Sequence, residues 1–73
     1  MDRDEQRWVR LTVNKGDGTY AFEEVEYSGG DWTATGATGE ARNARGKTGI
    51  SLGMIVRAFF NSTAESWEFE GGE

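Results

Sequence analysis

The chain has 73 residues, with 13 acidic and 8 basic side chains and a formal net charge of -5. It contains no His, no Cys and no Pro. A sequence without Cys and His has no disulfides, no thiolate nucleophile, and no imidazole to serve as a base or a metal ligand. We therefore expect no catalytic residues, no metal site and no cofactor, and a binding protein rather than an enzyme.

The length predicts a single small domain over residues 1–73. A chain this short buries only about 60% of its unfolded surface, so its stability should be marginal unless it packs well or oligomerises. Residues 1–6 and 71–73 are charged or Gly-rich and are expected to be loose ends. No stretch approaches the ~20 apolar residues of a membrane helix, so we expect no membrane partner. Because no secretory signal opens the chain, a cytoplasmic location is expected.

The first predicted strand covers residues 8–14, where apolar and polar side chains alternate. Val9, Leu11 and Val13 share one face, and Trp8 lies on the other. This period of two, with β-branched residues, is typical of a half-buried strand. The sequence Lys15-Gly16-Asp17-Gly18 then predicts a turn, because Gly accepts positive φ at no steric cost.

A second strand is predicted over residues 19–28. Phe22 and Val25 are both apolar but fall on opposite faces in strict alternation, so one extra residue at Glu23–Glu24 would realign them. We therefore predict a β-bulge there. The alternative is a strand with both faces partly covered. Ser28-Gly29-Gly30-Asp31 predicts a tight hairpin turn into a third strand, which makes an antiparallel meander.

The third strand starts at Asp31 and includes Thr35, but the Gly-rich residues 36–49 admit two interpretations. In the first, this strand continues to about Arg42, turns, and returns as a fourth strand over residues 47–50. In the second, the segment is a mobile functional loop. A structureless loop of this length is unusual in a compact domain.

A helix is predicted over about residues 51–61. Its apolar residues recur at helical spacing: Leu52, Ile55, Val56, Phe59 and Phe60. Ser51 is a natural N-cap, and Asn61 suits the left-handed C-terminal position. The run Met54–Phe60 also fits a buried strand, because β-branched and aromatic residues fill it.

A final half-buried strand is predicted over about residues 65–70, with Trp67 and Phe69 on one face. The expected fold class is therefore α+β. A small antiparallel meander of three to four strands would carry the helix 51–61 on the face of Val9, Leu11 and Val13, followed by the last strand.

The function predicted by elimination is that of a small acidic protein-interaction module, acting as an inhibitor, adaptor or accessory factor. Acidic strand faces would meet a basic partner surface, and exposed Trp side chains would anchor it. The candidate partner-binding residues are Trp8, Glu23, Glu24, Glu26, Trp32, Glu68 and Glu70. The Trp content also suggests that a second copy of the chain is a partner, in a homodimer.

The alternative function is single-stranded nucleic-acid binding by the basic Gly-rich loop 42–47, through Arg42, Arg45 and Lys47. The simpler interpretation is that these cations only balance an acidic chain, since a net charge of -5 repels a polyanion.

The segment GKTGISL, residues 46–52, resembles the strand-to-helix junction of the positive-cofactor-four family of single-strand-DNA-binding coactivators. The resemblance implies a curved antiparallel sheet, a helix-mediated dimer and basic loops that hold the strand. It covers about a tenth of the chain. The sequence departs from the family pattern because it is not basic and continues into an acidic, Trp-containing strand.

Overall fold

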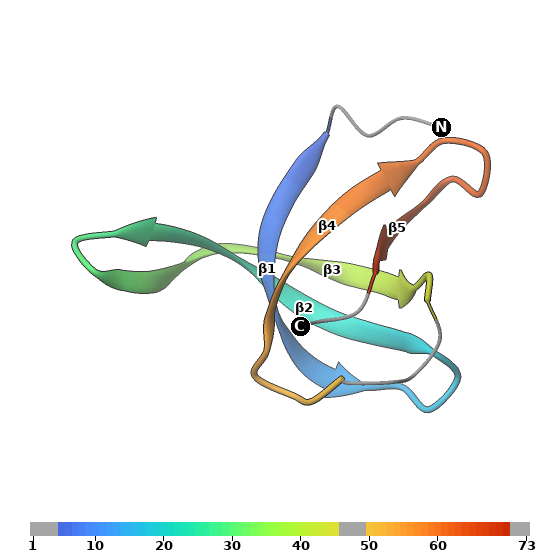
Figure 1. Cartoon of the computed structure of the whole chain (residues 1–73), viewed down its shortest axis with the longest axis horizontal. Coiled ribbons are helices and arrows are strands. Elements are labelled where there is room, and N and C mark those ends of the chain that lie inside the picture. Colours follow the sequence, from blue (N-terminus) through green and yellow to red (C-terminus); the bar gives the residue numbers. More distant parts are fainter. Residues whose placement is uncertain (1–4, 46–49, 71–73) are drawn as a thin grey trace.

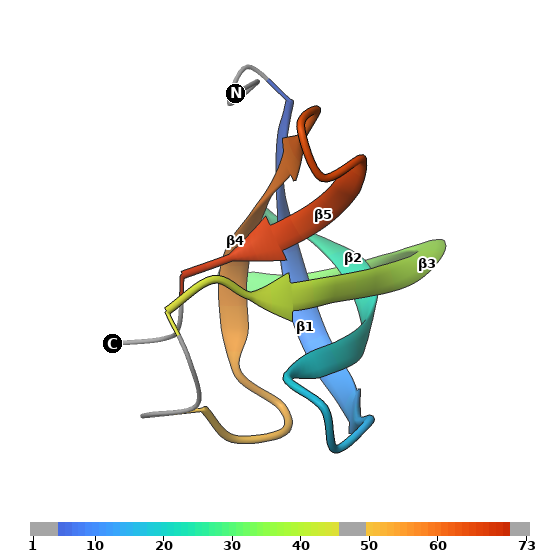
Figure 2. The same cartoon turned by 90° about the vertical axis from the view of Figure 1, so that its right-hand side faces the viewer.

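The computed structural model describes residues 5–45 and 50–70, and in this part of the chain the regular structure is all β. The strands are β1 (Gln6–Asn14), β2 (Thr19–Ser28), β3 (Asp31–Asn43), β4 (Ile55–Asn61) and β5 (Ser66–Phe69). They close into a barrel in the order β1-β2-β3-β5-β4 (Figure 1). β3 and β5 run parallel and lie side by side in Figure 2, whereas the other neighbouring pairs are antiparallel. Small Greek-key barrels of five strands include the OB-fold.

The predicted α+β class is wrong, because a turn and strand β4 replace the expected helix over residues 51–61. Gly53 has a φ of 88°, which is incompatible with a right-handed helix, and the Met54 amide donates to the Ser51 carbonyl at 3.2 Å to close a tight turn. Leu52, expected in the helix stripe, is 55% exposed.

The alternative interpretation of Met54–Phe60 as a strand is confirmed from Ile55 onward. Val56 and Ala58 are buried, and Arg57 between them is exposed, which is the period of two that a strand requires. β4 pairs with β1 on one edge and with β5 on the other. The barrel closes only through this strand, so pairing between distant segments outweighs the local helical spacing.

The meander of the first three strands is confirmed, but β1 contains a bulge that was not expected. Leu11 pairs with Phe22 and Val13 with Ala21, which leaves Thr12 as an extra residue. The bulge turns Val13 to the outer face, where it is 49% exposed. The prediction that Val13 shares the core face of Leu11 is therefore wrong.

The register irregularity predicted in the middle of β2 is present in its pairing with β3. Glu23 pairs with Thr38 and Val25 with Ala34, so residues 35–37 of β3 stand opposite a single residue of β2. The insertion therefore lies in β3, not in β2 as expected. Val25 is buried but lies outside the barrel cluster that contains Phe22, because without an insertion in β2 the two residues stay on opposite faces. The predicted realignment is therefore wrong, and the alternative of a strand with both faces partly covered fits.

β3 runs to Asn43, which confirms the longer extent considered for the third strand. Residues 46–49 lie outside the described residues, and Ile50 does not belong to a strand, so the expected returning strand is not seen at its described end. At the N-terminal end, the Glu5 carbonyl accepts a hydrogen bond from the Phe60 amide at 3.2 Å, and β1 follows directly. Residues 1–4 and 71–73 also lie outside the described part.

The barrel interior holds one cluster of buried side chains drawn from all five strands. Its members are Val9, Leu11, Tyr20, Phe22, Ala41, Val56, Ala58 and Phe69. β2 and β3 continue beyond the barrel as a two-stranded hairpin, residues 25–34, which projects to one side in Figure 1. This hairpin is called the arm below.

Candidate functional site

Three aromatic rings gather where the arm meets the outer face of the barrel. The ring centroids of Trp8 and Trp32 lie 5.5 Å apart, and those of Tyr27 and Trp32 lie 5.1 Å apart. Trp8 is 39% exposed and Tyr27 is 62% exposed. Contact between rings from β1, β2 and β3 therefore leaves much of their area open to solvent.

Two arginines hold this cluster in place. The Arg57 guanidinium lies over the Trp8 ring, 4.6 Å from its centroid, in a cation–π arrangement. Arg10 donates to the Glu23 carboxylate at 2.7 Å and to the Trp32 carbonyl at 3.5 Å, so it connects β1 with both strands of the hairpin. We call Trp8, Tyr27, Trp32 and Arg57 the aromatic surface.

Trp8 and Trp32, both predicted as partner-binding residues, are thus brought together. Tyr27 and Arg57 were missed by the sequence reasoning. Tyr27 had a signal, because a hairpin closed by Gly29–Gly30 places it opposite Trp32. Arg57 had none, since the expected helix separated it from β1.

The acidic residues of β2 do not form one free acidic face. Glu23 pairs with Arg10, and Glu24 pairs with Arg7 at 3.4 Å. The two carboxylate side chains are only 30% and 27% exposed. Glu26 is exposed and makes no ion pair with any described residue. It is therefore the acid of β2 that is available to a partner.

The acidic residues near the C-terminus belong to another part of the barrel. Glu68 lies on β5 and accepts a hydrogen bond from the Asn61 amide side chain at 3.2 Å. Glu70 is exposed just after β5. β5 pairs with β3 and β4, and its register places Glu68 opposite Arg42 of β3 and Phe59 of β4, not opposite a residue of the aromatic surface.

The basic candidates lie at the opposite end of β3 from Trp32. Arg42 is exposed and stands opposite Glu68 in the register, and Arg45 is exposed just beyond β3. Ten residues separate Arg42 from Trp32, which at about 3.3 Å per residue is at most about 33 Å along a straight strand. Lys47 lies outside the described residues.

The helix implied by the resemblance to the positive-cofactor-four family is wrong, because β4 stands where that helix and its dimer contact were expected. Four of the seven residues that carry the resemblance, 46–49, lie outside the described part of the chain. The described residues therefore include no helix that could mediate a dimer.

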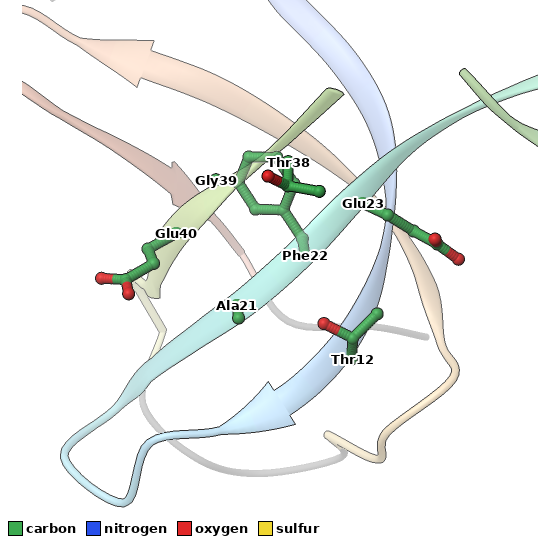
Figure 3. Close-up of a pocket in the computed structure, with 7 residues that line it drawn as sticks. All are labelled: Thr12, Ala21, Phe22, Glu23, Thr38, Gly39 and Glu40. Atoms are coloured by element: carbon green, nitrogen blue, oxygen red, sulfur yellow. The ribbon is translucent and has the colours of Figure 1, made fainter. Parts of the chain in front are cut away.

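A shallow hollow of about 470 Å³ lies on the outer face of β1, β2 and β3. Its lining is Thr12, Ala21, Phe22, Glu23, Thr38, Gly39 and Glu40. Figure 3 shows the Glu23 and Glu40 side chains at opposite ends of it, pointing away from each other. Glu23 is paired with Arg10, and Glu40 with Lys15 at 3.0 Å. The two carboxylates therefore cannot act together on one bond or one cation.

The chain matches no family model, and no curated protein or solved structure matches it. Across residues 5–45 and 50–70 there is no group of three or more acidic side chains placed to hold a metal ion. The same residues include no helix long and apolar enough to cross a membrane.

Proposed function

We propose that the protein is a non-catalytic protein-interaction module and that the aromatic surface is its contact site. The observation that carries the proposal is the contact of the exposed Trp8 and Tyr27 rings with the half-buried Trp32, with Arg57 on the Trp8 ring. Trp, Tyr and Arg are the residue types most enriched in the few positions that dominate binding energy in protein interfaces. A small barrel supports many functions, so the proposal rests on this site and not on the fold.

The surface is also preorganised. Arg10 ties the base of the arm to β1, and Arg57 fixes one face of the Trp8 ring. Side chains held before binding lose less conformational freedom on association, which favours affinity. A cytoplasmic location and the absence of a cofactor are parts of this proposal.

The partner should have a basic rim around an apolar contact. Glu26 and Asp31 are exposed on the arm, and within the described part of the chain neither forms an ion pair. Complementary charge raises the rate of encounter and selects the partner.

The test first recovers the partner by cross-linking it to the purified protein, which serves as bait. The affinities of variants for that partner are then compared. Trp32→Ala and Trp8→Ala should each weaken binding by about 2 kcal/mol, about 30-fold, the size of a hot-spot effect. Leu52→Ala is the matched control, because Leu52 is 55% exposed and lies outside the aromatic surface. Equal binding by the Trp variants and the control would refute the proposal.

Single-stranded nucleic-acid binding is the second candidate. Arg42 and Arg45 are exposed and, among the described residues, make no ion pair, whereas Arg10 and Lys15 are paired with carboxylates. Titration of single-stranded DNA at low salt, followed by Trp fluorescence, tests it. Salt-dependent binding that is lost in an Arg42→Ala, Arg45→Ala double variant would support this function over the first.

A further inference from the structure

β3 has an open edge along the arm. Its residues pair with β2 on one side, but on the other side β5 pairs only with Ala41–Asn43. Within residues 5–45 and 50–70, no strand covers the second side between Asp31 and Glu40. An uncovered strand edge presents main-chain donors and acceptors, so it is a template for another strand.

The hairpin register identifies the main-chain groups that face this edge. Ser28 pairs with Asp31 across a two-residue turn, and such a closing pair exchanges both of its hydrogen bonds. Antiparallel pairs alternate between bonded and non-bonded. The amides and carbonyls of Trp32 and Ala34 therefore point away from β2, and those of Thr33 point toward it. Arg10 covers the Trp32 carbonyl at 3.5 Å, which leaves both amides and the Ala34 carbonyl.

The two faces of the arm differ in chemistry. Opposed residues in a sheet share a face, and successive residues alternate between faces. One face therefore carries two opposed pairs, Val25 with Ala34 and Tyr27 with Trp32, and the other carries Glu26 with Thr33 and Ser28 with Asp31. The arm is aromatic on one face and acidic on the other.

We propose that an extended segment of the partner, in which apolar and basic residues alternate, adds to β3 of the arm as a further strand. Its apolar side chains would pack beside Trp32 and Ala34, and its Lys or Arg side chains would lie beside Asp31 and Thr33, close to Glu26. Main-chain hydrogen bonds supply affinity in this mode, and alternate side chains supply specificity. The inference rests on the proposed function and specifies its partner.

Charge excludes a second copy of the chain as the occupant. Two arms paired edge to edge would place Glu26 and Asp31 of both copies on one face of the joined sheet, where like charges repel. The edge is also short. The irregular residues 35–37, with Gly36 at a φ of 102°, end it on one side, and Arg10 covers its other end. Such bulges and covering groups are how native edges limit self-association.

The test uses a blocked synthetic peptide, acetyl-Lys-Val-Lys-Val-Lys-Val-amide, and amide hydrogen exchange of the full chain. At a peptide concentration about nine times its Kd, exchange at the amides of Trp32 and Ala34 should slow about tenfold. The Thr33 amide already faces β2, so its exchange should not change. The same peptide with Glu in place of Lys should give no protection, and neither should one with N-methylated Val residues.

Ala34→Pro is the decisive variant, because it removes an amide from the open edge without removing a hydrogen bond to β2. It should retain the fold and lose the peptide-dependent protection at Trp32. Unchanged Thr33 exchange in this variant shows that the hairpin is intact. No protection by millimolar peptide, protection that survives N-methylation, or protection that rises with protein concentration alone would overturn the inference.

The two proposals can fail separately. If Trp32→Ala weakens partner binding and Ala34→Pro does not, strand addition is wrong and the aromatic surface remains the contact site. If neither variant weakens it, both proposals are wrong.

Discussion

The indole rings of Trp8 and Trp32 lie 5.5 Å apart and are tilted by 55°, although β2 lies between their strands in the sheet. The contact requires the arm to bend back toward the outer face of β1. Val25 of the arm is also buried, although it lies outside the barrel cluster. The pair therefore reports the position of the arm relative to the barrel.

This contact should be visible by circular dichroism, because two adjacent indoles couple their transitions into an exciton couplet. Trp8→Phe and Trp32→Phe should each abolish the couplet. Trp67→Phe is the control, since Trp67 packs on Phe60 at 5.7 Å and has no indole neighbour of its own in the described residues. A couplet that survives Trp8→Phe would show that the arm lies elsewhere in solution.

Arg10 should matter more for the position of the arm than for overall stability. Its ion pair with Glu23 joins two side chains that are each 30% exposed, and exposed pairs contribute about 0.2–1 kcal/mol. Arg10→Gln should therefore lower the free energy of unfolding by no more than about 1 kcal/mol, measured with urea. The same change removes the charged donor to the Trp32 carbonyl and should weaken the couplet. A full-strength couplet would contradict the assigned role.

Gly39 is required by the ring of Phe22. A Cβ at position 39 would lie 2.9 Å from Phe22 Cζ, and Phe22 is only 7% exposed. Gly39→Ala should therefore lower the free energy of unfolding by about 1–3 kcal/mol, as overpacking does. In a Phe22→Leu background, which lacks Cζ, the same change should have a smaller effect. Strict additivity in this double-mutant cycle would show that the two residues do not meet.

The first three strands could be predicted because their signals are local. Alternation and Gly-containing turns gave β2 its observed bounds, Thr19–Ser28. β4 could not be separated from a helix in this way, because its short apolar run fits both periods. The decisive residue was Gly53, whose positive φ serves a turn, and the decisive interaction is barrel closure by distant strands, which local spacing does not encode.

Trp8 and Trp32 of the aromatic surface were predicted from the sequence, but Tyr27, Arg57 and the arrangement of the four residues were not. Trp8 and Trp32 stood out by residue type, yet their contact depends on the curvature of the arm. Arg57 reaches Trp8 only because β4 pairs with β1. The assignment of Val13 to the core failed because nothing in the alternation marks the bulge at Thr12.

The bulge at Thr12 predicts unequal effects of substitution on its two sides. Val13→Thr should change the free energy of unfolding by less than about 0.5 kcal/mol, since the side chain is half exposed. Leu11→Ala should lower it by about 2–5 kcal/mol, because Leu11 is 1% exposed in the barrel core. Urea unfolding measures both. A loss above about 2 kcal/mol for Val13→Thr would mean that the strand runs without the bulge.

The turn between β1 and β2 should make stability depend on pH through Asp17. The pKa of Asp17 lies below its usual 3.8, chiefly because the Thr19 amide donates to its carboxylate at 3.1 Å. A carboxyl group with a lowered folded-state pKa stabilises the fold fully above its unfolded pKa, and this contribution is lost as pH falls through the folded value. Wild type should therefore exceed Asp17→Asn in free energy of unfolding at pH 7, and the difference should shrink as the pH falls below 3.8. Urea unfolding of both chains from neutral to strongly acidic pH measures it. The other carboxylates are common to both chains and cancel in the comparison, so a difference that grows on acidification would contradict the assigned hydrogen bond.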